Sequence, residues 1–307
     1  MRNHDQSTAG RNRVWVGLLA AVAILAGCQG AGTPLSSPDS GRIESLAGAP
    51  QSEHDFLKTL GAGESARETR GVATPISAPT VITTPGEYLV ANDFSVSAET
   101  GDGIVIQADD VMLDLGGHVI SGPGNKLGRA IVVDGANRAR VSNGTVATFG
   151  IGVALQSAEH CIVRGINIEG GDETAAPPAN PPQIGFLLVN SSRNFVGRNT
   201  CTLVNLGIFV RGGGSSGNRI AHNLVVGGDN GLLAICYNPA MGEGPAGPSG
   251  DLVIENKLSR FGKGIQTSEG SSYNGFNANV IEYFALAWED FNGTNQFLNN
   301  ITTQIMP

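Results

Sequence analysis

The chain has 307 residues, of which 40% are hydrophobic, and its formal net charge is −8. Such an acidic balance argues against a nucleic-acid partner, because Lys and Arg must neutralise the phosphates. An acidic protein also repels a polyanionic polysaccharide. We therefore expect the protein to bind a neutral sugar, or an anionic sugar held through a bridging cation. The length is sufficient for one domain with a continuous core.

The N-terminus has the features of an export signal. Arg11 and Arg13 precede an apolar run over residues 14–26, which is too short for a comfortable membrane span. Leu25-Ala-Gly-Cys28 resembles a bacterial lipobox, in which the cysteine is lipidated and becomes the mature N-terminus. We therefore predict a signal peptide over residues 1–27 and an exported protein anchored to a membrane through Cys28. By this resemblance Gln29 implies the outer membrane in a host with two membranes. An ordinary signal peptide with an incidental cysteine, or a short membrane anchor, are the alternatives.

Residues 28–54 are rich in Gly, Ser, Ala and Pro, which predicts a flexible tether. The segment from Ser52 to Gly61 begins with a helix-capping serine, carries apolar residues at helical spacing and ends in glycine. We expect one short helix there. It would cap the open end of the domain over residues 55–307 and so prevent edge-to-edge pairing.

A repeated phrase occupies the chain from Phe195 onward: an apolar residue, two variable residues, Asn, one further residue and usually another apolar residue. Its asparagines are Asn199, Asn223, Asn256, Asn279 and Asn300. A second polar column precedes it at Asn194, Asn218, Asp251, Asn274 and Asn295. A repeat of this length predicts a coil stacked on copies of itself, in which equivalent Asn side chains hydrogen-bond along the stack.

Each repeat also contains a second short strand that usually opens with glycine. We predict these strands at residues 103–106, 130–133, 152–155, 185–188, 207–210, 231–234, 264–267 and 285–288. Strands so short, separated by Gly, Asn and Ser, cannot each be followed by a helix. A turn of about 22 residues has room for only two or three strands and their bends.

This pattern resembles the right-handed parallel β-helix repeat family within the pectate-lyase-like superfamily. The segments 82–90, 111–122 and 141–146 are similar to the first coils of many such proteins, and the resemblance covers about residues 80–307. It implies an all-β, single-stranded right-handed parallel β-helix of about eight or nine coils. It leaves the function open, because this scaffold carries lyases, hydrolases, epimerases and proteins without enzymatic activity.

Stacking brings the residues that precede the Asn column together on the surface. Arg198, His222 and Glu255 should lie on three consecutive coils, where they could bind an anionic group or transfer a proton. They are the candidate catalytic residues. The alternative is a solvated ladder of compensating charges.

Other positions suggest weaker sites. Insertions at residues 170–183 and 238–250 present Asp172, Glu173 and Glu243, which we consider binding candidates. Asp109 and Asp110 could help to hold a cation such as calcium, although hard cations need six to eight oxygen ligands. No two histidines have the spacing of a local metal motif, so no metal site is predicted. His118, in a turn typical of the family, is expected to form structural hydrogen bonds.

Two apolar features remain. The middle residues of the glycine-opened strands form an outward apolar row, which is either covered by the chain itself or a surface for an oligomer or partner: Val105, Val132, Ala154, Leu187, Phe209 and Leu233. Cys161, Cys201 and Cys236 are predicted to be buried thiols rather than a disulfide with a spare cysteine.

The function predicted from these features is carbohydrate binding along the stacked face. A polysaccharide lyase, hydrolase or epimerase is the first alternative. The calcium site of pectate lyases, the Asp-Pro-His-Asp motif of alginate epimerases and the paired carboxylates of polygalacturonases are not found. A structural or partner-binding envelope protein is the second alternative. A role in metallocentre maturation would need clustered His, Met or Cys, which the sequence lacks.

Overall fold

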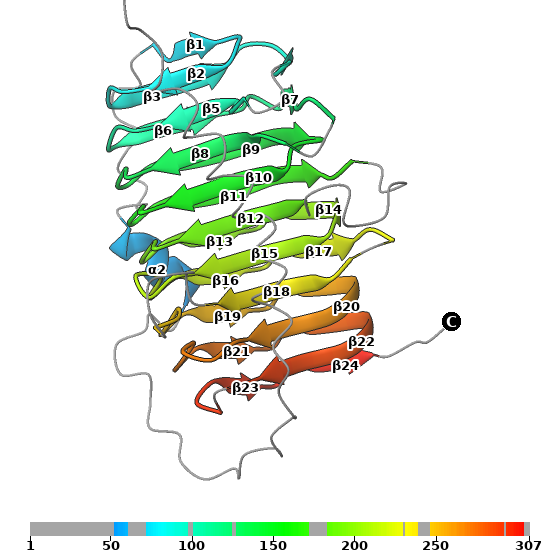
Figure 1. Ribbon diagram of the computed structural model, residues 1–307. Helices are drawn as coiled ribbons and strands as arrows, with labels where there is room; N and C mark the ends of the chain where they lie inside the picture. The colour runs from blue at the N-terminus through cyan, green and yellow to red at the C-terminus, as the bar shows by residue number, and fades with distance from the viewer. Residues whose placement is uncertain are drawn as a thin grey trace, which may run out of the picture.

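Parallel strands wound into a solenoid form most of the computed structural model. It describes residues 52–60, 72–97, 101–124, 127–171, 183–229, 231–238, 246–291 and 293–303. The solenoid has about eight turns, which stack in chain order from β1 at one end to β24 at the other (Figure 1). The predicted all-β parallel β-helix is confirmed.

Each turn contributes strands to three faces. The helix-side face consists of β1 (Thr74–Ile76), β3 (Gly86–Val90), β6 (Val111–Asp114), β13 (Phe195–Gly197), β16 (Arg219–Ala221), β19 (Leu252–Ile254), β21 (Gly275–Asn277), β23 (Gln296–Leu298) and the first halves of β9 (Arg140–Ala147) and β11 (Ile162–Glu169). The open face consists of β4 (Phe94–Ser95), β7 (Val119–Ser121), the second halves of β9 and β11, β14 (Thr200–Val204), β17 (Leu224–Gly227), β24 (Ile301–Thr303) and the first parts of β20 (Lys257–Thr267) and β22 (Val280–Asp290). The apolar face consists of β2 (Thr80–Ile82), β5 (Ile104–Ile106), β8 (Arg129–Asp134), β10 (Ile151–Gln156), β12 (Ile184–Val189), β15 (Leu206–Arg211), β18 (Leu233–Asn238) and the ends of β20 and β22.

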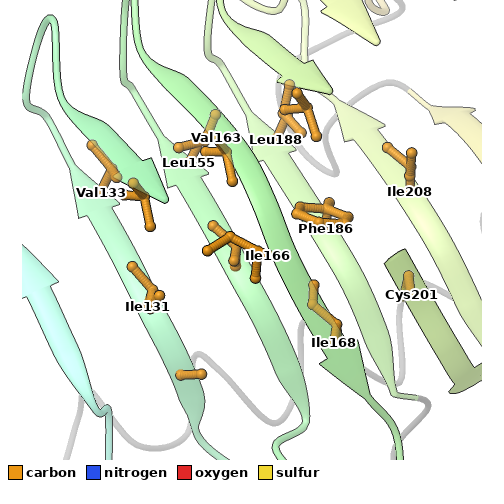
Figure 2. Packing of buried hydrophobic residues seen from close by; sticks show 14 of the residues in the cluster. Ile131, Val133, Leu155, Val163, Ile166, Ile168, Phe186, Leu188, Cys201 and Ile208 are labelled. Atoms are coloured by element: carbon orange, nitrogen blue, oxygen red, sulfur yellow. The ribbon is translucent and has the colours of Figure 1, made fainter. Parts of the chain in front are cut away.

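The interior is filled by every second side chain of the strands, which stack on the same residue of the next turn. Figure 2 shows Ile131, Leu155 and Phe186 among these inward side chains. Cys201 lies between Ile168 and Val225 in register and is 1% exposed, which confirms its predicted place in the core.

The glycines that open the strands of the apolar face have a steric cause. A Cβ added to Gly185 would lie 2.6 Å from the carbonyl oxygen of Gly207 on the next turn and would collide with the Sγ of Cys201. Gly207 and Gly264 meet the carbonyl oxygens of Ala234 and Ala287 in the same way. Glycine therefore allows successive turns to approach at the strand spacing of about 4.8 Å.

Both predicted asparagine columns form ladders. Asn199 donates from Nδ2 to Oδ1 of Asn223 at 3.1 Å, and Asn223 donates to Asn256 at 2.9 Å. The second ladder runs from Asn194 through Asn218, Asp251 and Asn274 to Asn295. These side chains satisfy backbone N–H and C=O groups at corners where no strand pairing is available.

The predicted helix forms as α2 (Glu53–Thr59), and the side chain of Ser52 caps it by accepting from the backbone N–H of Asp55. The expectation that it caps an open end is wrong. Phe56 and Leu60 pack against Ile162 and Phe195, so α2 lies on the flank of the solenoid beside its middle turns (Figure 1). The apolar residues of α2 therefore cover an apolar strip on the outer surface of the helix-side face.

The predicted outward apolar row exists, but one of its predicted members, Leu233, is replaced by Cys236. Phe209 pairs with Cys236, whereas Leu233 lies three residues earlier in its strand, in register with Leu206. The chain between β17 and β18 holds extra residues, so the strand predicted at 231–234 begins later, and Ala234 takes the place of a glycine. The strand predicted at 285–288 is likewise displaced, because Ile265 pairs with Trp288.

Most of the row is buried, with an exposed fraction of 6% or less from Val132 to Cys236. The hydrophobic residues packed with it belong to the same face or border it. A partner or oligomer interface at this row stays a prediction.

Candidate functional site

The candidate residues Arg198, His222 and Glu255 lie at the corner between the helix-side and open faces. Each has a left-handed backbone, with φ between 55° and 57°, and each is followed by an asparagine of the ladder. Such a conformation costs a residue with a Cβ roughly 1–2 kcal/mol, and the ladder hydrogen bonds on the following residue offset this cost. The backbone turn directs the three side chains outward on consecutive turns.

A fourth residue completes the cluster. Glu53, in the first turn of α2, places Oε1 2.9 Å from Nη2 of Arg198 and Oε2 3.0 Å from Nε2 of His222. The Nδ1 atom of His222 lies 3.1 Å from Oε2 of Glu255. The stacking argument is thus confirmed for the juxtaposition of the predicted residues, and α2 supplies the additional carboxylate.

The imidazole of His222 lies between two carboxylates. Both of its nitrogens can donate to these oxygens only when the ring carries two protons. Arg219, almost buried in β16, faces the same carboxylates: burial lowers its pKa, while Glu53 and Glu255 raise it. The cluster therefore contains two cations, two carboxylates and one titratable base, and the charges compensate one another.

The groups of the cluster could act as acid and base, but their hydrogen-bonding capacity is used within the protein. The side chain of Glu53 is only 13% exposed, because it lies between α2 and the flank of the solenoid. In this arrangement the cluster fastens α2 to the flank. Docking buries Phe56 and Leu60, worth roughly 1.5–3 kcal/mol each, and this gain must offset the entropy of ordering the helix.

The remaining predicted sites have different outcomes. Asp172, Glu173, Glu243 and Cys28 lie outside the described residues. Among the described residues no group of three or more His, Cys, Asp or Glu is arranged to hold a metal ion.

The two neighbouring aspartates have protein partners. Asp109 accepts from the backbone N–H of Asn137 at 2.8 Å, and Asp110 forms a paired contact with Arg138 at 2.7 Å. The contact with Arg138 lowers the pKa of Asp110. These carboxylates thus join adjacent turns, and no cation is needed to explain their positions.

His118 has the structural role that was predicted, because its Nδ1 lies 2.9 Å from Oδ1 of Asp93 on the preceding turn. The three cysteines within the described range are buried thiols that form no disulfide, as predicted. Burial raises the pKa of the Cys161 thiol to about 12 and that of Cys201 further still, so neither is a reactive nucleophile.

Sequence reasoning missed two functional features. Glu53 was visible only as an acidic residue in the first turn of a helix, and nothing in the sequence says where that helix docks. Asp251 was read as a member of the Asn column, but its carboxyl group is fully buried, and burial raises its pKa to about 7. The pKa of the neighbouring Tyr237 is also raised by burial.

The outer surface of the open face carries partly exposed polar side chains in its middle turns. Thr145, Asn167 and Thr200 lie in register on successive turns and are partly exposed. Glu169 and Thr202 form a parallel row beside them. In these turns the face presents short hydroxyl, amide and carboxylate groups, and the first row continues with Leu224 and Lys257 on the next two turns.

The chain belongs to the family described as right-handed beta helix region, whose pattern matches residues 81–240, just over half of the sequence. No curated protein matches the sequence. No helix within the described ranges is both long and apolar enough to cross a membrane.

Several solved structures share the coil. An exopolygalacturonase from Thermotoga maritima is 9% identical, with a TM-score of 0.48 over 90% of this chain and 80% of that one. A pectate lyase from Xanthomonas campestris is 11% identical, with a TM-score of 0.46 over 81% of this chain and 84% of that one. A tailspike protein of E. coli bacteriophage HK620, solved with a hexasaccharide, is 10% identical, with a TM-score of 0.46 over 75% of this chain. This chain spans about half of that tailspike, 47% of its length. These similarities carry no argument about activity.

Proposed function

We propose that the protein is exported, anchored by lipid at Cys28, and binds carbohydrate along the open face of its solenoid. The observation that supports this proposal is the partly exposed row of polar side chains on β9, β11 and β14. The acidic net charge and the neutral character of most side chains on this surface favour a neutral glycan.

The geometry of the open face suits an extended sugar chain. Equivalent residues on successive turns are about 4.8 Å apart, so Thr145, Asn167 and Thr200 repeat hydrogen-bonding groups along the solenoid axis. Asn167 donates from Nδ2 to Oε1 of Glu169 at 2.8 Å, which orients the amide and leaves its oxygen free to accept from a sugar hydroxyl.

The test is a glycan array probed with the full-length chain in detergent, with and without calcium. We expect binding to neutral glycans that weakens at least tenfold in the double variant Thr200→Val with Asn167→Leu. Thr74→Val is the matched control, because Thr74 is an exposed strand residue on the helix-side face. Binding unaffected by the double variant would exclude the open face, and silence on every glycan would favour a scaffold or partner-binding protein.

A polysaccharide lyase, hydrolase or epimerase is the second candidate. The observation in its favour is the position of His222 between two carboxylates, beside Arg198. Overnight incubation with each bound glycan would detect chain shortening, an unsaturated product or an epimerised sugar. Turnover that is lost in His222→Ala would establish the enzyme and place its site at this corner.

A further inference from the structure

The helix α2 depends on the solenoid for its structure. It has seven residues, and an isolated helix of this length does not persist in water. Its apolar side consists of Phe56, Leu57 and Leu60, which pack against Ile162 and Phe195 of the flank. The rings of Phe56 and Phe195 have centroids 6.4 Å apart. When these contacts are lost, the helix should unfold locally.

The contacts that hold the turns of the solenoid together do not involve α2. The ladders and strand pairings join one turn to the next, and none of these contacts includes a residue of α2. Detachment of the helix is therefore compatible with an intact coil. Local opening of this kind is typical of segments with few buried contacts.

The polar end of the contact is built around the imidazole ring of His222. The groups that surround the ring of His222 are Glu53 from α2, Glu255 after β19, Arg198 after β13 and Arg219 in β16. A ring with two protons donates to both carboxylates. A neutral ring turns one lone pair toward a carboxylate oxygen, which weakens the attachment of either Glu53 or Glu255. Histidine is the side chain that commonly changes charge near neutral pH.

We propose that α2 is a detachable clasp that binds the flank of the solenoid most tightly when His222 is protonated. The docked clasp fastens the chain that precedes Ser52 to the middle turns. The proposal does not depend on carbohydrate binding or on the lipid anchor.

The test is hydrogen exchange of the full-length chain at pH 5.5 and pH 8, corrected for the intrinsic exchange rate. The relevant amides include Phe56 and Leu60, which donate to the carbonyl oxygens of Ser52 and Phe56. We expect protection of residues 53–60 to fall at least tenfold from pH 5.5 to pH 8, while protection of the core strands changes by less than twofold.

Two variants and a matched control separate the clasp from general stability. His222→Gln should abolish the pH dependence of α2 protection, and Glu53→Gln should lower this protection at both pH values. His160→Gln is the control, since His160 has the same left-handed corner conformation, with φ of 57°, and an acidic neighbour in Glu159.

Two results would overturn the proposal: α2 protection equal to that of the core at both pH values, or a pH dependence that survives in His222→Gln. If His222→Gln disturbs the coil, hydrogen exchange of the core strands will be faster. In that case Glu53→Gln is the decisive variant, because Glu53 lies outside the coil. Unchanged α2 protection in that variant would also overturn the proposal.

Discussion

The backbone N–H of Asn218 donates to Oδ1 of Asp251 at 2.7 Å, and the side-chain amide of Asn218 donates to the same oxygen at 3.2 Å. The other carboxyl oxygen, Oδ2, is buried and accepts no backbone hydrogen bond, and the carboxyl group interacts with the buried hydroxyl of Tyr237. In the neighbouring rungs the amide of Asn218 or Asn274 donates to the carbonyl oxygen of Ser191 or Pro248. Asp251 can supply a donor at the corresponding position only when it is protonated, because an ionised carboxylate only accepts.

This arrangement predicts stability that falls as pH rises. Burial raises the pKa of Asp251 from 3.8 to about 7, so the folded state binds a proton that the unfolded state has released between these values. Stability from this group is fully present below about pH 4 and is lost as pH rises through 7. From pH 5 to pH 8 the loss should be on the order of 3 kcal/mol.

Urea unfolding of Asp251→Asn tests this prediction. The amide restores the neutral rung, so the variant should lack this part of the pH dependence and should be more stable than the wild type at pH 8. The same slope between pH 5 and pH 8 in both proteins would show that the carboxyl is not the source. Glu269→Gln is the control, because Glu269 is exposed between β20 and β21 and lies outside the His222 cluster.

A second prediction concerns the ladder itself. Asn223 accepts from the backbone and side chain of Asn199 and donates to the carbonyl oxygen of Val196 and to Asn256. Asn223→Ala leaves several of these buried groups unsatisfied and should destabilise the protein by roughly 3–5 kcal/mol in chemical unfolding. Asn92→Ala, at an exposed position between β3 and β4, should cost less than about 0.5 kcal/mol. Equal losses would mean that the ladder bonds add nothing to stability.

A third prediction follows from the close approach of the turns. Gly185→Ala should destabilise the protein by roughly 1–3 kcal/mol, because its Cβ meets a backbone oxygen of the next turn that cannot move alone. Gly262→Ala is the matched control, since the nearest atom to its added Cβ is the carbonyl oxygen of Leu232 at 3.4 Å. A thermal melt of the two variants compares them directly. A tolerated Gly185→Ala would contradict the steric explanation of the glycine column.

A fourth prediction concerns the thiols. In a Cys28→Ser chain a thiol reagent should label none of Cys161, Cys201 and Cys236 in the folded protein. It should label all three after unfolding, because they are buried thiols outside any disulfide. Rapid labelling of the native protein would show that at least one is accessible. Labelling of only one after unfolding without a reductant would show that a disulfide had formed.

A fifth prediction tests the anchor. Cells that express the full-length chain should incorporate radiolabelled palmitate into the protein, and Cys28→Ser should abolish this label. Cys236→Ser is the control, because Cys236 is buried in β18. Label retained in the Cys28→Ser chain would exclude the predicted lipidation site, whatever the glycan array shows.

The repeat in the sequence was sufficient to predict the class of fold and much of its register. Asn199, Asn223 and Asn256 recur because each turn needs the same hydrogen bonds at the same corner, and such local periodic constraints are visible in one dimension. The same periodicity placed Arg198, His222 and Glu255 side by side. The prediction from periodicity was wrong at Leu233, because extra residues before this strand shift the repeat by a few positions.

What only the tertiary structure decided is where the non-repeating parts meet the coil and what burial does to individual groups. No spacing connects Glu53 to His222, because the docking of α2 depends on the shape of a surface assembled from several turns. Asp251 resembles its asparagine neighbours in sequence, yet full burial changes the chemistry of its carboxyl group. The sequence by itself therefore determined the repeating scaffold, since each turn specifies its own pairing. The tertiary structure decided the clasp and the buried proton, since both depend on surroundings that no single repeat contains.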